Sequence, residues 1–353
     1  MDALVLLFAF LVILAGAELF TNGIEWFGRK LELAEGAVGS VLAAVGTALP
    51  ETMIPIIAIG FGGRGAASDA VGIGAILGAP FMLSTLAMFV TGLGVIAFRG
   101  RRASGMRMTV DTGVLVHDIR YFVVAYALAI AAAFLPPSLG PVRLLVAVAL
   151  LGMYARYVKG HFDADAGTGS EELAPLRLHR LDRRGHRVDP AVPRLRIVGT
   201  QVLMALACIV GGAYLFVGAV TSLAAAFGVS ELLLALVIAP IATELPEKLN
   251  SVIWVRQGKD TLAMGNITGA MVFQSAIPTV VALVLAGDSW HVGTGSALAF
   301  GSAAMALLAV VAVFGPMRVR RSLDGPALLV GGVLYAAYVA LVILSLAGVL
   351  PFG

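Results

Sequence analysis

Long apolar segments separated by short polar loops dominate this chain and constrain its fold more than any other feature. Most of these segments exceed 18 residues, and a helix of about 20 residues crosses the roughly 30 Å hydrocarbon core of a bilayer. Only 13% of the residues are charged, against about 25% in a typical soluble domain. The segments also lack the polar and apolar alternation of membrane-barrel strands. The sequence therefore predicts an all-α membrane protein.

We expect ten transmembrane helices from the apolar periods. They cover residues 2–28, 36–62, 69–98, 113–134, 139–158, 197–226, 229–255, 260–287, 292–315 and 325–348. The first segment could instead be a secretory signal peptide, but such a signal carries a basic residue before its apolar part. Arg29 is the first basic residue here and follows the segment, so we interpret the segment as a membrane helix.

The basic residues gather on one side of this predicted arrangement. When the loops are numbered alternately, one side holds 20 of the 24 Lys and Arg residues, and the other holds only Arg64 and Arg143. Arg120 lies at the inner end of the fourth helix and Lys248 deep in the seventh. Because cytoplasmic loops are enriched in Lys and Arg, we expect a multi-pass cell-membrane protein with both termini outside and loop 159–196 in the cytoplasm.

The two halves of the chain are related by an internal repeat. Residues 16–51 match residues 212–247 at 11 of 36 positions without a gap. We therefore divide the chain into a first five-helix repeat, 1–158, and a second, 197–353, joined by the polar linker 159–196, which we interpret as a solvated connector. Because five is odd, the second repeat enters the membrane from the opposite side, and such inverted repeats are typical of secondary transporters.

The most similar part of the repeat is a short phrase within an apolar stretch, GTALPE at 46–51 and ATELPE at 242–247. A proline inside a helix removes the hydrogen bond to the carbonyl four residues earlier. Those carbonyls belong to Gly46 and Ala242. In hydrocarbon, a freed carbonyl is tolerated where it lines a cavity or meets a cation.

Each phrase also brings a hydroxyl next to a carboxylate. Thr47 and Glu51 are four residues apart, as are Thr243 and Glu247, so each pair shares a helix face. A carboxylate at the bilayer centre is costly, which indicates a function for both acids. Hydroxyl, carbonyl and carboxylate oxygens together form a ligand set for a hard cation.

Two copies of this motif, on the second and seventh of ten helices and each followed by a GxxxG helix, resemble the alpha repeats of the calcium/cation antiporter superfamily. Sodium/calcium exchangers are its best-known members. The resemblance covers about 300 residues. It implies the exchanger fold and a site where helices two, three, seven and eight meet. Glu51 and Glu247 would bind Ca²⁺ and Na⁺, or H⁺, alternately, with Thr47 and Thr243 as neighbouring ligands.

The chain departs from the pattern of this family at several ligand positions. Ala48 and Glu244 stand where the family usually has Ser, and GAP at 78–80 and GAM at 269–271 replace GSN or GSD. Asn266 is retained in the second repeat. Since Ca²⁺ takes six to eight oxygen ligands, these changes predict a poorer calcium site.

Lys248 is the other departure, since it follows Glu247 directly and lies four residues after Glu244. One hypothesis is that Lys248 acts as an internal counter-ion when no metal is bound, which would favour exchange against protons, because burial promotes deprotonation of lysine. The alternative is a structural pair with Glu244.

Polar residues outside the motif are weaker candidates. Glu18, Asn22 and Glu25 on the first helix face either the ion pathway or an interface. His117 and Asp118 are expected near the inner end of the fourth helix, in contact with headgroups or water.

The sequence thus predicts a secondary antiporter that exchanges Ca²⁺ or another cation against Na⁺ or H⁺ by alternating access. A Na⁺/H⁺-type cation/proton exchanger and a transport-incompetent sensor or scaffold are the alternatives. Enzymatic motifs such as HExxH and GxSxG are absent from the sequence, so we expect no enzyme and no cofactor. The expected partners are inorganic cations and the lipid bilayer, with no nucleic acid.

Overall fold

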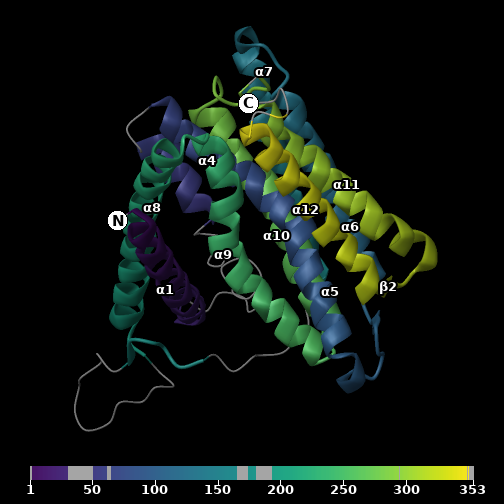
Figure 1. Cartoon of the computed structure of the whole chain (residues 1–353). Helices are drawn as coiled ribbons and strands as arrows, with labels where there is room; N and C mark the ends of the chain where they lie inside the picture. The colour runs from purple at the N-terminus through teal and green to yellow at the C-terminus, as the bar shows by residue number, and fades with distance from the viewer. Residues whose placement is uncertain are drawn as a thin grey trace.

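The computed structural model describes residues 2–30, 51–61, 65–164, 174–179, 193–293, 295–347 and 349. The side chains of 161–164, 242 and 245–250 lie outside this part. Within it, the chain is a bundle of long helices (Figure 1). Eight of these helices are long and apolar enough to cross a membrane, as expected for a multi-pass membrane protein.

The helices follow the predicted segments closely. The first half contains α1 (Asp2–Lys30), the helix Glu51–Phe61 ending in η2 (Ile56–Phe61), α4 (Ala66–Met82), η3 (Leu83–Ala87), α5 (Met88–Ala97), η4 (Arg99–Arg101), β1 (Arg107–Met108), α6 (Thr112–Ala132), η5 (Pro137–Leu139) and α7 (Gly140–Ala164). The second contains α8 (Leu195–Phe227), α9 (Glu231–Arg256), α10 (Asp260–Leu285), α11 (Ala297–Arg320), β2 (Leu323–Asp324) and α12 (Gly325–Leu346). The second predicted helix is described only from Glu51, so the count of ten stays a prediction.

Two helices form the inside of the bundle. Within the stretch Ala66–Ala97, where α4 continues through the π-helical turn η3 into α5, the most apolar window is 83% buried, and the corresponding window of α10 is 61% buried. By contrast, α1 and α12 are only 22% buried and expose large apolar side chains such as Leu4, Phe8 and Val333. Apolar side chains outside the bundle are compatible with lipid contact. The inner helices are those that the sequence placed at the ion site.

Glycines allow α4 to approach the backbone of α9 closely. A Cβ atom added to Gly74 would lie against the carbonyl oxygen of Leu232, and one added to Gly78 against that of Leu236, both closer than 3 Å. Small residues at such spacing let helix backbones meet inside membranes. This GxxxG pair therefore sets the distance between α4 and α9.

Gly78→Ala is expected to lower stability by about 1 to 3 kcal/mol, because the added methyl group must push α4 away from α9. The thermal unfolding midpoint of the purified protein in detergent measures this change. Gly211→Ala on α8 is the matched control, since nothing lies within 4 Å of its added Cβ. Equal midpoints for the two variants would contradict the close contact.

A buried ion pair fixes the loops at one end of the bundle. Arg102 donates two hydrogen bonds of 2.7 Å to the carboxylate of Asp260, and both side chains are fully buried. Arg102 also donates to the carbonyl oxygen of Val255 at 2.5 Å, and the Asp260 carboxylate accepts the backbone N–H of Thr109 at 2.7 Å. The α5–α6 loop is thereby tied to the α9–α10 turn.

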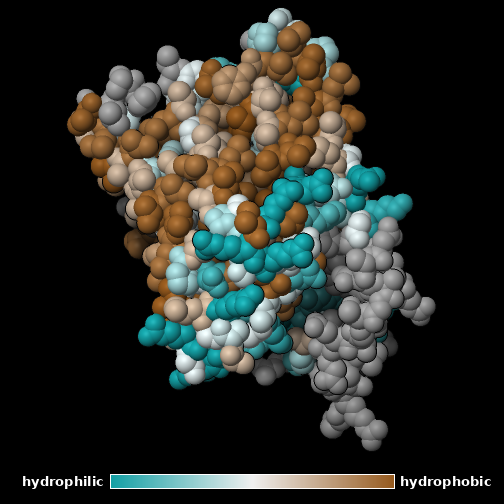
Figure 2. Space-filling view, turned by 90° about the vertical axis from the view of Figure 1, so that its right-hand side faces the viewer, coloured by the Kyte–Doolittle hydropathy of each residue, from teal (hydrophilic) through white to brown (hydrophobic). Residues whose placement is uncertain are grey.

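The short ribbon β1–β2 joins this end to the α11–α12 turn, with Arg107 opposite Asp324 and Met108 opposite Leu323. Exposed basic side chains surround it, including Arg99, Arg318 and Arg320. Figure 2 shows the apolar side chains as a broad band, with the hydrophilic ones gathered below it. The described α5–α6, α9–α10 and α11–α12 connections, which the sequence assigned to one side with their basic residues, therefore lie at one end of the bundle. Which side of the membrane they face stays a prediction.

Helices α1 and α8 pack along each other in antiparallel directions. A Cβ on Gly16 would contact the carbonyl oxygen of Ala205 and the side chain of Ile209, and a Cβ on Gly212 would contact the carbonyl oxygen of Ala9 and Ile13. On each helix, the absence of a glycine side chain therefore leaves room for an alanine and an isoleucine of the other helix. The two halves of this contact are equivalent.

Part of the linker is docked rather than solvated, which corrects the interpretation of 159–196 as a solvated connector for residues 174–179. Leu176 is fully buried against Trp26 and Val198. The carbonyl oxygen of Ala174 accepts a hydrogen bond from Trp26 at 2.9 Å, and Asn22 accepts one from the backbone N–H of Arg177 at 2.9 Å. This segment therefore packs against α1 and α8 through Leu176 and its backbone.

Two polar residues of α1, Glu18 and Asn22, take part in the same contact. Asn22 is buried and also accepts a hydrogen bond from Gln201 of α8 at 3.0 Å. Glu18 is exposed and forms a 2.8 Å ion pair with Arg177. Both residues thus contact the linker segment; a place for Glu18, Asn22 or Glu25 on the ion pathway or near an interface stays a prediction.

Candidate functional site

The first acid of the repeated motif lies at the start of the described part of the second helix. Glu51 is 6% exposed, and the helix that follows it ends in the π-helical turn η2. π-helical turns inside longer helices are frequent at functional sites. The local backbone therefore places a carboxylate inside the bundle.

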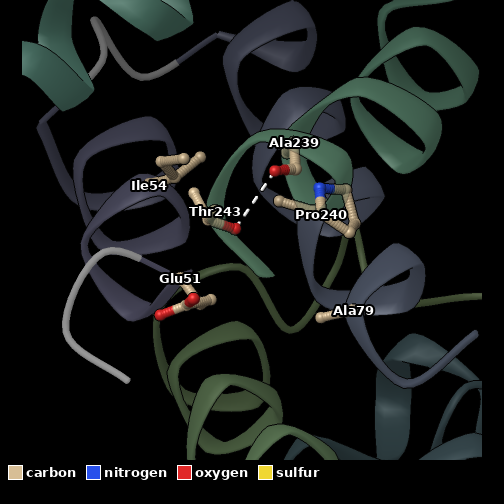
Figure 3. A pocket seen from close by; sticks show the side chains of 7 residues that line it. Glu51, Ile54, Ala79, Ala239, Pro240 and Thr243 are labelled. Carbon is tan, nitrogen blue, oxygen red and sulfur yellow. Dashed lines mark hydrogen bonds between the residues drawn. The ribbon is translucent and has the colours of Figure 1, made fainter. Parts of the chain in front are cut away.

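Glu51 lines a small cavity together with residues of α4 and α9 (Figure 3). The lining residues are Glu51, Ile54, Ala75, Ala79, Ala239, Pro240 and Thr243. The cavity volume is about 10 Å³, which is near the minimum that one water-sized particle requires. Among the described residues of this lining, the Glu51 carboxylate is the charged group.

The hydroxyl of the second motif lies on the opposite wall of the cavity. Thr243 is 3% exposed, and its hydroxyl donates a 3.1 Å hydrogen bond to the carbonyl oxygen of Ala239 one turn earlier (Figure 3). Its oxygen keeps lone pairs that can accept from a water molecule or coordinate a cation. Glu51 and Thr243, which are 192 residues apart in the sequence, thus meet at one cavity.

Glu244, the residue after Thr243, turns toward α10. It is 1% exposed, and its carboxylate accepts a 3.0 Å hydrogen bond from the side-chain amide of Gln274. Gln274 is 2% exposed. Gln274 was not among the residues predicted from the sequence, although an amide within the apolar stretch of α10 was a signal, because buried polar groups in membranes require partners.

The described parts of helices two, three, seven and eight pack together around this region. The helix Glu51–Phe61 contacts α4 and α10 through η2, and α9 contacts both α4 and α10. The resemblance implied a meeting of these four helices. The fold brings them together, whereas cation binding there stays a prediction.

Several predicted ligands lie outside the described part of the structure. Thr47 and the carbonyl of Gly46 precede Glu51 in residues 31–50, and the side chains of Ala242, Glu247 and Lys248 are not described within α9. The backbone of α9 is helical from Glu231 to Arg256 across all three. Their role as ligands, or as counter-ion for Lys248, stays a prediction.

Asn266 is held away from the cavity lining. Its amide donates a 3.3 Å hydrogen bond to the hydroxyl of Ser251 on α9, which in turn donates to the carbonyl oxygen of Ala263 at 3.2 Å. Ser251 is eight residues, or about 12 Å of helix rise, beyond Thr243. This bond joins α9 and α10; the metal-ligand role of Asn266 stays a prediction.

The expected position of Asp118 at headgroups or water was wrong. Asp118 is 1% exposed, and its carboxylate accepts hydrogen bonds from Tyr157 of α7 and Thr268 of α10. Its neighbour His117 is exposed and stacks on Tyr157. The 3.6-residue helical period turns the adjacent side chains to different faces, so only Asp118 reaches the interior.

The arrangement is chemically suited to holding one small cation. Glu51 supplies a buried negative charge and Thr243 a neutral oxygen at the cavity, whereas the bonded pair Glu244 and Gln274 lies outside its described lining. Oxygen ligands of this kind suit hard cations. In the described part of the chain, no three His, Cys, Asp or Glu side chains form a metal-binding group, so the described residues alone offer a sparse ligand set.

Comparison with known proteins places this arrangement in a family. The sequence profile of the family "sodium/calcium exchanger protein" matches residues 1–160 and 199–347. A relative from Alkalimonas amylolytica, a candidate antiporter called CaxA, is 31% identical over 137 residues. That match covers 38% of this chain and 43% of the relative, so it spans less than half of the relative's length.

Solved structures of exchangers share the fold. The H⁺/Ca²⁺ exchanger CAX aligns with a TM-score of 0.68 at 16% identity, covering 98% of this chain and 87% of that one. The structure called native YfkE aligns with a TM-score of 0.59 at 16% identity, covering 94% and 89%. The sodium-calcium exchanger NCX_Mj aligns with a TM-score of 0.51 at 17% identity, covering 96% and 97%.

The matched profile covers both halves of the chain, including Glu51 with its cavity and the second motif on α9. The chain therefore belongs to the sodium/calcium exchanger family, within the calcium/cation antiporter superfamily.

Proposed function

We propose that this protein is a secondary antiporter that exchanges Ca²⁺, or another cation, against H⁺ or Na⁺. The observation that carries the proposal is the buried Glu51 carboxylate, which lines a cavity of single-particle size together with Thr243. Burial of a carboxylate inside the membrane part of a protein costs free energy, so its retention there indicates a function such as transport. Membership of an exchanger family supports the same activity, and no enzymatic reaction is part of the proposal.

The proposed mechanism is alternating access in two inverted repeats of five helices each, 1–158 and 197–353. The reciprocal contact of α1 and α8 supports this architecture, because Ala9, Ile13 and Gly16 correspond to Ala205, Ile209 and Gly212 at the same offset of 196 residues as the repeat. The equivalent helices run antiparallel, as inverted repeats require. Two equivalent halves give inward-open and outward-open states of similar free energy, so one site can face either side.

The coupling ion that we propose is the proton, with Na⁺ as the alternative. The cavity walls include Ala75 and Ala79, which offer no side-chain oxygens, whereas Ca²⁺ takes six to eight oxygen ligands. A site with few neutral oxygens depends on its carboxylates, and carboxylates bind protons as well as cations. In the proposal Glu247 completes the site, and Lys248 serves as a counter-ion when the metal leaves. The similarity in fold to the H⁺/Ca²⁺ exchanger CAX supports the proton as coupling ion.

A second candidate is a Na⁺/H⁺-type exchanger without calcium transport, which the same apolar walls favour. A transport-incompetent sensor or scaffold is the third. In all three cases we place the protein in the cell membrane, with both termini outside and linker 159–196 in the cytoplasm.

Flux measurements in liposomes test the proposal. Purified protein is reconstituted and the uptake of radioactive Ca²⁺ and Na⁺ is followed under an imposed pH gradient, an imposed Na⁺ gradient and neither. We expect Ca²⁺ uptake that the pH gradient accelerates at least about tenfold over empty liposomes. Uptake driven only by the Na⁺ gradient would replace H⁺ by Na⁺ as the coupling ion, and absence of flux for every cation would refute the antiporter.

A further inference from the structure

A second buried carboxylate lies outside the cavity, where α6, α7 and α10 meet. Asp118 of α6 accepts a 3.0 Å hydrogen bond from the hydroxyl of Tyr157 on α7. Its other oxygen accepts a 2.6 Å hydrogen bond from the hydroxyl of Thr268 on α10. Asp118 and Thr268 are at most 1% exposed. One carboxylate thus ties three helices together.

The buried position of Asp118 makes it a costly residue if its role is only to hold helices together. It lies six residues after the start of α6 at Thr112, which corresponds to about 9 Å of helix rise from that end. Neutral hydroxyl and amide groups can bridge helices inside a membrane without burying a charge, as the Asn266–Ser251 bond between α10 and α9 does. An ionisable residue in such a place indicates a function.

Helix α10 connects Asp118 to the candidate cation site. It is one continuous helix from Asp260 to Leu285. It carries Thr268, which is bonded to Asp118, and Gln274, which is bonded to Glu244 beside the cavity. Gln274 lies six residues after Thr268, a helix rise of about 9 Å that turns the two side chains to different faces. A rigid helix held at Thr268 therefore presents Gln274 to α9 at a fixed height and rotation.

We propose that Asp118 is a positioning residue for the cation site: through Thr268 it fixes α10, and thereby holds the Gln274 amide against the Glu244 carboxylate. This role rests on the proposed function. Tyr157 restrains the carboxylate from the α7 side, so that its second oxygen stays directed at Thr268. Loss of the Thr268 bond lets α10 shift and moves the Gln274 amide away from Glu244, which weakens cation binding although both carboxylates and the Gln274 side chain are still present.

The test uses Thr268→Val, which keeps the shape of the side chain but removes the hydroxyl, and Thr268→Ser, which keeps the hydroxyl. The matched control is Thr91→Val on α5, where a fully buried threonine bonds only its own helix, at the carbonyl oxygen of Ala87, among its described contacts. Thr268 also bonds its own helix, at Met264, so the control reproduces that part of the loss. Each variant is reconstituted in liposomes, and its Ca²⁺ uptake is measured against Ca²⁺ concentration, together with its thermal unfolding midpoint.

We expect Thr268→Val to raise the half-saturating Ca²⁺ concentration about tenfold, the effect of one lost hydrogen bond to a charged group. Its maximal rate should change less than about twofold. Thr268→Ser and Thr91→Val should stay within about twofold of the parent in both quantities.

A purely structural bond would lower the unfolding midpoint of Thr268→Val and leave its half-saturating concentration unchanged, which would overturn the inference. Failure of the proposed function is visible in the parent protein alone, as absent flux together with no Ca²⁺-dependent rise of its unfolding midpoint. In that case the positioning role is refuted with it, since there is no cation site to position. Flux in the parent with unaltered saturation in Thr268→Val refutes the positioning role only.

Discussion

Replacing Glu51 by Gln is expected to lower the rate of cation uptake into liposomes at least about 100-fold. The substitution keeps the shape of the side chain and removes its negative charge from a cavity whose other described lining residues are neutral. Loss of a buried charged interaction costs about 2 to 5 kcal/mol, and about 2.7 kcal/mol corresponds to a factor of 100. Initial rates of radioactive Ca²⁺ uptake under a pH gradient measure the effect.

Glu18→Gln is the matched control for this prediction. It makes the same chemical change at a glutamate whose side chain is 66% exposed and pairs with Arg177, so its uptake rate should equal that of the parent. The unfolding midpoint of Glu51→Gln should not fall below that of the parent, because a neutral amide is cheaper to bury than a carboxylate. Parent-like uptake by Glu51→Gln would remove Glu51 from the site.

Arg102→Ala is expected to produce the largest loss of stability, about 3 to 5 kcal/mol. It leaves the buried carboxylate of Asp260 without its bidentate partner, and an uncompensated buried charge costs this much. It also removes the donor to Val255 at the end of α9. The thermal unfolding midpoint in detergent and the yield of folded protein measure the loss.

The adjacent Arg101→Ala serves as control, since Arg101 is exposed and should contribute less than about 0.5 kcal/mol. The double variant Arg102→Ala, Asp260→Ala should recover part of the stability, because it removes the unpaired carboxylate as well. A double variant no more stable than Arg102→Ala would show that the arginine acts mainly through its bonds to carbonyl oxygens.

The site was predictable from the sequence to the extent that its residues carry a charge inside an apolar helix. Glu51 and Glu244 were selected as acids in apolar helices and Thr243 for its four-residue spacing from the acid of its motif, and the structure buries all three. Gln274 was missed because an uncharged amide near the middle of α10 carries a weaker signal. Asp118 was misplaced because its distance along the sequence from the helix end suggested an interface, whereas burial depends on which face the helix turns inward.

The linker shows a similar limit. The composition of residues 159–196 is that of a solvated segment. Local composition carries no information on which other helices of the molecule can pack against it. Leu176 is buried because Trp26 and Val198 lie beside it on two helices far apart in the sequence. The bonds of Asn22 and Gln201 to the same segment complete this contact.

The sequence by itself determined the helical membrane class, the approximate bounds of the helices and the two motifs with their acids. The length of an apolar segment, the period of its apolar residues and the cost of burying a charge in it are local properties, so they can be inferred from the sequence alone. The tertiary structure decided which groups face each other: Glu51 with Thr243 at the cavity, Glu244 with Gln274, and Asp118 with Thr268. These pairings depend on helix rotation and on backbone distances such as the one that Gly78 permits between α4 and α9, and both are set by packing between segments distant in the chain.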